Sequence, residues 1–228
     1  ACVFAALDAA ERAEEAGLDG RIVVEAVAGE EEGGIGAAAA ALSNPYPFER
    51  DAAIVAEPTE LTPITATEGT VMKRLEVQGR AAHAASRWRG EDVLPHFERI
   101  RAAFQELETE RGETVTHPLY EEYPVPWPIV IGIVEAGNWA SSVPSSLTAE
   151  MRFGVAPGAT VDEVEQQYEE ALQAVVDSDD WLSEHPPTFE RFSIQFESAE
   201  VDADEPIVRT LREAMMDTGL PDTDPRGA

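Results

Sequence analysis

The sequence predicts an α/β protein in which part of a parallel-sheet domain is interrupted by an inserted ferredoxin-like α+β domain. Two apolar runs, residues 22–28 and 51–56, have the pattern of buried parallel strands, and acidic residues follow both of them. Residues 66–199 follow the order β-α-β-β-α-β, which is the order of a ferredoxin-like layer. We therefore expect residues 1–65 and 200–228 to form one domain around an inserted domain at 66–199.

The N-terminal elements follow from local signals. Apolar residues at helical spacing predict a helix over residues 1–17, and Gly17 can adopt the left-handed conformation that ends helices. An alanine-rich run predicts a second helix over residues 36–42, which the proline-containing segment 44–47 interrupts.

The inserted domain is predicted from alternating strands and amphipathic helices. Strands are expected over residues 70–77, 128–135, 147–153 and 188–197, and helices over 92–110 and 161–176. A further helix is expected over residues 204–218, because apolar side chains gather there on one side.

The composition is strongly acidic. Among 228 residues, 45 are Asp or Glu and 16 are Lys or Arg, so the formal net charge is -29. This charge repels nucleic acid and anionic membrane surfaces, and we expect neither as a partner. Lys73 is the only lysine, and a lysine-poor acidic surface on an ordinary core favours a halophilic protein of a high-salt cytoplasm. The alternative is an ordinary acidic protein.

Cysteine and hydrophobicity exclude further classes. The single cysteine, Cys2, rules out an internal disulfide framework and a cysteine-based zinc site. No apolar run approaches the roughly 20 residues of a membrane span, and no secretory leader pattern is present at the start. We expect a cytoplasmic protein.

The acidic residues after the two predicted strands suggest a metal site. Glu30, Glu31 and Glu32 follow the first strand, and Glu57 follows the second. Parallel strands end at the same edge of a sheet, where ligands bind, and adjacent carboxylates are stabilised by a cation. A divalent metal with a neighbouring carboxylate as base would explain this pattern. The alternative is a set of unrelated loop glutamates in an acidic chain.

Four motifs occur in one order along the chain. They are Glu-Glu-x-Gly-x-x-Gly at residues 30–36, Glu-Pro-Thr at 57–59, Gly-Arg-Ala-Ala-His-Ala at 79–84, and a segment at 136–153 that contains Ala-Gly-Asn, Val-Pro and Met-Arg-Phe. In these motifs the chain resembles the zinc-dependent peptidases and amidases that include acetylornithine deacetylase, succinyl-diaminopimelate desuccinylase, aminoacylase and glutamate carboxypeptidase. The resemblance implies a catalytic domain on the parallel sheet and an inserted lid, or dimerisation, domain.

The resemblance also implies roles for the acidic residues. It places the general base on Glu30 and a metal ligand on Glu31, and it makes Glu57 a further ligand. A shift of one residue would place the base on Glu31 and the ligand on Glu32. We prefer Glu30, because only that register keeps both glycines of the motif.

The resemblance implies that the lid completes the active site. His83 matches a histidine that reaches the active site of the partner subunit and stabilises the oxyanion, a role suited to a preorganised donor. The alternative for His83 is a surface histidine after a strand. Arg152 matches an arginine that pairs with the substrate carboxylate, although a surface ion pair is a competing interpretation. Asn138 belongs to the same substrate-binding motif. His96, His117 and His185 lie outside the motifs, and we interpret them as structural or surface residues.

The chain also departs from this family. Ser141 and Ser142 occupy the place of an asparagine before Val143-Pro144. The first ligand motif, His-x-Asp, the bridging aspartate and the last histidine ligand are absent, and carboxylates from two motifs do not complete a zinc site. We therefore expect a chain truncated at both ends, which by itself is inactive.

The predicted function is hydrolysis of the amide bond of an N-acyl amino acid or small peptide, with an acetylornithine deacetylase-like activity ranked first. The implied cofactor is Zn²⁺, two ions per subunit, and Co²⁺ or Mn²⁺ would suit carboxylate ligands as well. The implied assembly is a homodimer through the lid. The alternative is a non-catalytic dimerisation or peptide-binding module that pairs through an exposed strand edge.

Overall fold

The computed structural model describes residues 2–31, 33–44 and 46–228. Its contacts divide the chain into two compact units, Ala1–Leu61 and Thr62–Ala228. No helix in these described ranges is long and apolar enough to cross a membrane.

Two helices are present among the described residues of the first unit. Helix α1 spans Cys2–Glu15, and helix α2 spans Ile35–Ser43. The N–H of Gly17 bonds to the carbonyl of Glu14 and the N–H of Leu18 to that of Ala13, both at 3.0 Å, which is the paired arrangement that ends a helix at a glycine. The predicted end of the first helix is confirmed.

The strands predicted at residues 22–28 and 51–56 are wrong. Both segments lack regular secondary structure, and apart from the half-buried Val23 their apolar side chains are exposed, among them Val24 at 41% and Val55 at 80%. A strand is held by the backbone groups of a neighbouring strand, and within the described part of this unit no such neighbour is formed. The apolar pattern shows that these segments could be buried in a sheet, but they do not form one with each other.

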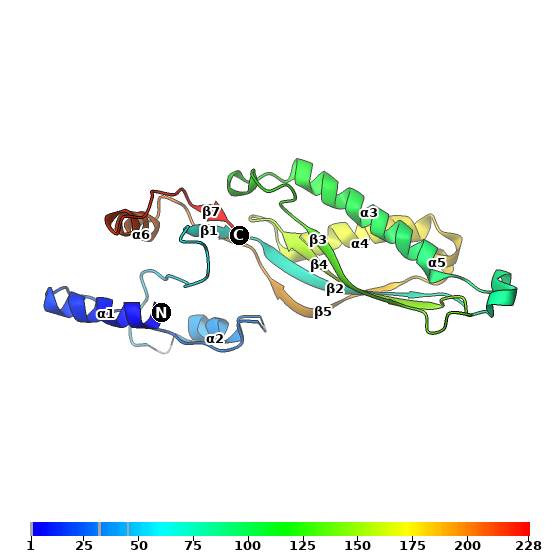
Figure 1. Cartoon of the computed structure of the whole chain (residues 1–228), viewed down its shortest axis with the longest axis horizontal. Helices are drawn as coiled ribbons and strands as arrows, with labels where there is room; N and C mark the ends of the chain where they lie inside the picture. The colour runs from blue at the N-terminus through cyan, green and yellow to red at the C-terminus, as the bar shows by residue number, and fades with distance from the viewer. Residues whose placement is uncertain (1, 32, 45) are drawn as a thin grey trace. The chain divides into compact units, whose positions relative to one another are not determined.

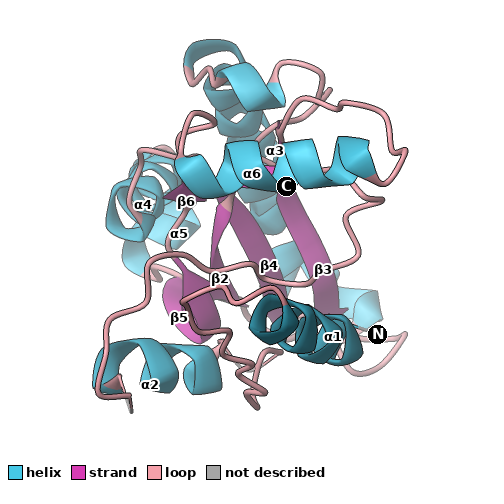
Figure 2. Ribbon diagram, turned by 90° about the vertical axis from the view of Figure 1, so that its left-hand side faces the viewer, coloured by secondary structure: helices cyan, strands magenta, loops and turns pink. Residues whose placement is uncertain are grey.

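The second unit contains a four-stranded antiparallel sheet. Its strands are β2 (Gly69–Gln78), β3 (Ile129–Ala136), β4 (Ser146–Val155) and β5 (Thr188–Phe196), and their order across the sheet is β3-β4-β2-β5, as Figure 2 shows. Helices α3 (Val93–Thr114) and α4 (Val161–Asp177) pack on one face (Figure 1). The predicted β-α-β-β-α-β layer is confirmed as a ferredoxin-like fold.

The core of this unit lies between the sheet and the two long helices. An aromatic cluster occupies its centre: the ring of Phe104 lies 5.8 Å from Phe153 and 5.4 Å from Tyr168, and Phe153 lies 4.1 Å from Tyr168. Around it pack the fully buried aliphatic side chains Val71, Leu75, Val77, Val93, Ile100 and Leu147. A close-packed core of this kind is rigid and can hold the connecting loops in fixed positions.

Lys73 is buried beneath helix α4 with its charge compensated. Its ammonium pairs with Glu165 and, at 3.0 Å, with Glu169. Burial alone would raise the pKa of Glu165, but hydrogen bonds from Arg191 and Lys73 hold that pKa below its usual value. The only lysine is therefore a structural residue of the sheet.

Capping side chains fix the starts of the two long helices. Asp92 accepts a hydrogen bond from the N–H of Leu94 at 3.0 Å, and Thr160 and Glu163 form a capping box. Three short helices were not predicted: η1 (Ala84–Arg89), η2 (Pro118–Tyr120) and α5 (Asp180–Glu184).

A second, small sheet joins distant parts of this unit. Its strands are β6 (Ala199–Glu200), β1 (Ile64–Thr67) and β7 (Arg226–Gly227), and helix α6 (Pro206–Asp217) lies between β6 and β7 in the chain. The hydroxyl of Tyr120 donates to the carbonyl of Ala228 at 2.7 Å, and that of Tyr123 donates to Gly227 at 2.8 Å. These tyrosines attach strand β7 to the loop after helix α3.

Tyr120 predicts a loss of stability at alkaline pH. Burial raises its pKa to about 12, so the folded state holds this proton more tightly than the unfolded state, whose tyrosine has its ordinary pKa of 10.0. The contribution is complete below pH 10 and disappears as the pH rises through about 12. In urea titrations we expect the unfolding midpoint to fall over this interval, and to fall less in Tyr120→Phe. An equal fall in both proteins would contradict the assignment.

Candidate functional site

The acidic turn precedes helix α2. Gly33 has φ 91°, a left-handed conformation that favours glycine, and a Cβ at Gly36 would lie 2.3 Å from the carbonyl oxygen of Ala28. The N–H of Gly36 bonds to that same oxygen at 3.1 Å. At both glycines of the predicted motif, a residue with a side chain would therefore strain the backbone or clash with it.

The predicted metal-site residues are exposed. Glu30, Glu31 and Glu57 all present their side chains to solvent, and Glu32 lies outside the described residues. No three potential ligands approach one another in the part of the chain that the structure describes. The described residues thus do not fit a complete zinc site, and any metal would need ligands besides these glutamates.

His83 lies at the start of helix η1. Its Nδ1 accepts a hydrogen bond from the N–H of Ala85 at 3.1 Å, so a neutral ring carries its proton on Nε2. The ring is exposed, with Trp139 packed edge-on at a centroid distance of 6.0 Å. The capping bond therefore leaves an N–H donor directed at no partner within the described residues.

The segment that carries His83 is tied to the loop between β3 and β4. The N–H of Ala84 donates to Ser141 at 2.9 Å, and the N–H of Val143 donates to Ala82 at 2.8 Å. Asn138 and Trp139 lie on that loop, and both are exposed. The structure therefore brings two predicted site residues, His83 and Asn138, onto one pair of connected loops.

Arg152 lies on β4, in register with Met72 and Val130. Its guanidinium pairs with the carboxylate of Glu68, whose second oxygen is buried without a hydrogen-bond partner among the described atoms. Arg152 is thus engaged in an ion pair in this structure, as the competing interpretation of the sequence expected.

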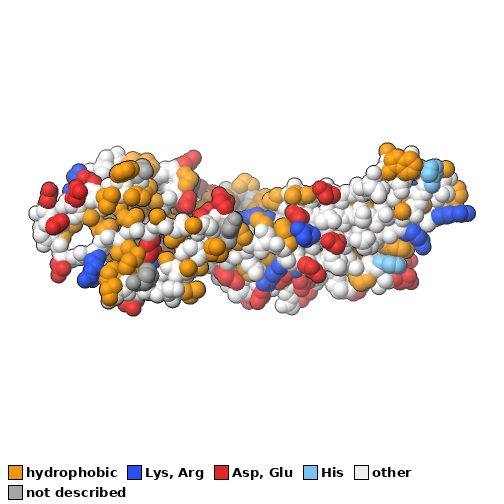
Figure 3. Space-filling model, turned by 90° about the horizontal axis from the view of Figure 1, so that it is seen from below, with side chains coloured by type: hydrophobic (Ala, Val, Ile, Leu, Met, Phe, Trp, Pro, Cys, Tyr) orange, Lys and Arg blue, Asp and Glu red, His pale blue; other side chains and the backbone are white. Residues whose placement is uncertain are grey.

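The loops around His83 are locally cationic. Residues 79–90 contain three arginines and no acidic residue. Arg87 and Arg89 are exposed and form no ion pair with any residue that the structure describes, and Trp88 between them is 76% exposed. Figure 3 shows Lys or Arg, His and hydrophobic side chains together at the right-hand end of the view. A count of charges along the sequence could have found this feature.

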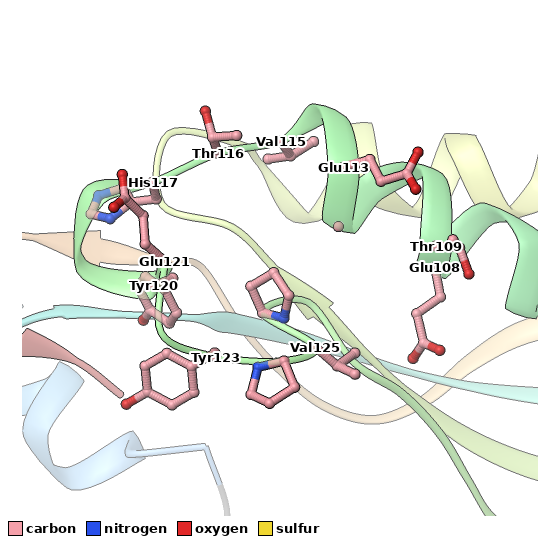
Figure 4. A pocket seen from close by; sticks show the side chains of 13 residues that line it. Glu108, Thr109, Glu113, Val115, Thr116, His117, Tyr120, Glu121, Tyr123 and Val125 are labelled. Carbon is pink, nitrogen blue, oxygen red and sulfur yellow. The ribbon is translucent and has the colours of Figure 1, made fainter.

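One described hollow of this unit lies apart from the sequence motifs. A pocket of about 470 Å³ lies beside the end of helix α3, lined by Glu108, Glu113, His117 and Glu121 with Tyr120, Tyr123 and prolines (Figure 4). Both ring nitrogens of His117 have hydrogen-bond partners: Nε2 lies 3.2 Å from a carboxylate oxygen of Glu200, and Nδ1 accepts a hydrogen bond from the N–H of Leu119. None of the predicted catalytic or metal-binding residues lines this pocket.

Comparison with known proteins agrees with the fold. Residues 65–180 match the family model described as a peptidase dimerisation domain. A probable carboxypeptidase of Aspergillus flavus is 32% identical over 181 residues, which are 77% of this chain and 40% of that protein. The acetylornithine deacetylase of Pectobacterium carotovorum is 27% identical over 144 residues, or 60% of this chain and 36% of that protein.

Solved structures share the architecture. A tripeptidase of Staphylococcus aureus has a TM-score of 0.61 at 17% identity, covering 88% of this chain and 48% of that one. An aminopeptidase of Bacillus cereus has a TM-score of 0.56 at 15% identity, and the match covers 89% of this chain and 49% of that one.

The ferredoxin-like layer and its match define a peptidase dimerisation domain. The chain belongs to the M20 peptidase family, and the resemblance inferred from its motifs is confirmed. It spans about 40% of the length of the curated relatives that it matches.

Proposed function

We propose that this protein is a metal-dependent hydrolase that cleaves the amide bond of an N-acyl amino acid or small peptide. The observation that carries the proposal is the acidic turn, where Gly33 and Gly36 occupy glycine-requiring positions beside Glu30 and Glu31. Relatives named as a probable carboxypeptidase and an acetylornithine deacetylase support it. Deacetylation of an amino acid is our first choice among these reactions.

Glu30 is the general base of the proposed reaction. It takes a proton from the attacking water and passes it to the leaving amine, a task for which a positioned carboxylate is suited. Glu31 and Glu57 would each bind one metal ion, Zn²⁺ or else Co²⁺ or Mn²⁺, and residues other than these glutamates would have to supply the remaining ligands. A bound metal of this kind activates water for attack.

His83 stabilises the negative charge that develops on the carbonyl oxygen. Its capping bond to Ala85 fixes Nε2–H as the free donor of the neutral ring, which is the preorganisation that such stabilisation needs. Asn138 and Arg152 bind the substrate, and the substrate carboxylate must compete with Glu68 for Arg152.

Residues 66–199 act as the dimerisation lid, and residues 1–65 and 200–228 as part of the catalytic domain. A second copy of the chain pairs with the lid at the edge strand β3, where Val130, Ile133 and Val134 are each about half exposed, at 49%, 50% and 47%. An edge strand with exposed apolar side chains is a template for pairing. The acidic composition suits a high-salt cytoplasm.

A non-catalytic dimerisation module is the second candidate. One observation favours it: no described residue of 1–61 is buried, whereas the second unit has an extensive core. Such a chain would pair or bind peptides without performing hydrolysis.

The metal content and amidase activity of the complete gene product separate the two candidates. In molar KCl we expect about two Zn²⁺ per subunit by elemental analysis, and hydrolysis of N-acetyl amino acids that EDTA abolishes and Zn²⁺ restores. A dimer with neither bound metal nor turnover would overturn the hydrolase and support the binding module.

A further inference from the structure

His96 lies buried between two carboxylates near the start of helix α3. The residue is 4% exposed, its Nδ1 lies 2.7 Å from an oxygen of Asp179, and its Nε2 lies 2.9 Å from an oxygen of Glu91. The ring therefore links the segment that contains Asp179 to the segment that contains Glu91. Because none of the sequence motifs contains His96, its burial needs its own explanation.

The Asp179 end of this link is rigid. One oxygen of Asp179 accepts hydrogen bonds from the N–H groups of Trp181 and Leu182 and so caps helix α5, while the other meets His96 and Arg99. Burial alone would raise the pKa of Asp179, but the bonds from Leu182 and His96 hold it below its usual value. The carboxylate is therefore a fixed, charged anchor.

The Glu91 end of the link closes the segment that carries His83. The N–H of Arg80 donates to the carbonyl of Glu91 at 3.0 Å, and the N–H of Glu91 donates back to Arg80 at 2.8 Å. Residues 80 and 91 thus form the base of a loop that contains His83. The side chain of Glu91 reaches from this base to His96.

Helix α5 also supports the other side of the loop base. The indole N–H of Trp181 donates to the carbonyl of Gln78 at 2.8 Å, and the guanidinium of Arg80 lies 5.2 Å from the centre of the Trp181 ring. The chain therefore enters and leaves the His83 loop at points that are both connected to α5.

We propose that His96 is a positioning residue for His83, which it holds through Glu91 and the paired base of residues 80–91. The proposal rests on the assigned role of His83 in hydrolysis. His96 itself touches no substrate. It fixes the end of the loop from which His83 offers its N–H donor, and a loop displaced by about 1 Å loses much of that stabilisation.

Hydrogen exchange measured at single amides of the 228-residue chain tests the positioning directly. His96→Leu removes both ring nitrogens, and we expect exchange at Arg80 and Glu91 to become about tenfold faster, because a hydrogen bond to a charged partner is lost at the loop base. Amides of strand β4 provide the reference and should keep their rates. His96→Gln keeps an N–H donor and should restore part of the protection.

Two further variants complete the test. Glu91→Ala breaks the same link from its partly exposed end without removing a buried side chain, so it should accelerate the same two amides if His96→Leu fails to fold. His117→Leu is the matched control, because His117 also faces a glutamate but lies at η2. Unchanged exchange at residues 80 and 91 in both His96→Leu and Glu91→Ala would overturn the proposal.

Kinetics of the complete gene product connect the positioning to catalysis. We expect His96→Leu to lower kcat about tenfold with little change in KM, since the lost stabilisation belongs to the transition state. An unchanged kcat with accelerated exchange would show that the loop is held but His83 has no such role. If the protein has no hydrolase activity, the exchange data still decide whether His96 holds the loop.

Discussion

Replacement of Glu30 by Gln should lower kcat of the complete enzyme by about a thousandfold while its metal content stays unchanged, because an amide cannot accept the proton that a general base removes from water. The side chains are nearly equal in size, and Glu30 is exposed, so folding should be unaffected. Turnover of an N-acetyl amino acid and elemental analysis on the same preparation are the two measurements.

The neighbouring glutamates provide the controls for this assignment. Glu31→Gln should lose both metal and turnover, because it removes a ligand. Glu49→Gln makes the same change of charge at another exposed position of the first unit and should leave both intact. If Glu31→Gln kept its metal but lost turnover, the base would be Glu31 and the ligand Glu32, which is the alternative register of the motif.

The strands and the two long helices of the ferredoxin-like layer could be predicted from the sequence to within a few residues. The helix expected at 161–176 is found at Val161–Asp177, and the strand expected at 70–77 is found at Gly69–Gln78. The apolar residues of these strands and helices recur with the period of the secondary structure that they form. The sheet and the helices then bury those apolar residues against one another. Local preference and tertiary packing agree there.

The first unit shows what such patterns omit. Residues 22–28 and 51–56 have strand composition, yet a strand forms only where another backbone supplies its hydrogen bonds, and that partner is not encoded in the segment itself. The need for glycine in the acidic turn was easier to predict, because it depends only on nearby residues. Gly33 has a positive φ, and a side chain at Gly36 would clash with the backbone of Ala28.

Side-chain partners within the candidate site were the least predictable. The pairing of Arg152 with Glu68 joins residues 84 positions apart, and the burial of His96 depends on Asp179, 83 positions away. Periodicity carries no information on such contacts, because they are set by the packing of whole elements. The sequence therefore identified which residues resemble an active site, but not which of them already have partners.

Phe104→Ala should be the most damaging single change to the second unit, costing about 3 to 5 kcal/mol in its free energy of unfolding. Phe104 is fully buried, and its ring meets Phe153, Tyr168 and Phe189, the last at 5.6 Å. Removing it leaves a cavity at the point where α3, α4 and the sheet meet, and the side chains around it are too constrained by one another to fill the space.

The tryptophans make this prediction measurable in the intact chain. All four, at positions 88, 127, 139 and 181, belong to the second unit, so the urea dependence of tryptophan fluorescence reports the unfolding of that unit alone. Phe196→Ala is the matched control, because the same truncation at a side chain that is 39% exposed should cost less than about 1 kcal/mol. Similar losses in the two variants would mean that the aromatic cluster does not hold this unit together, and that the unit depends on contacts outside this core.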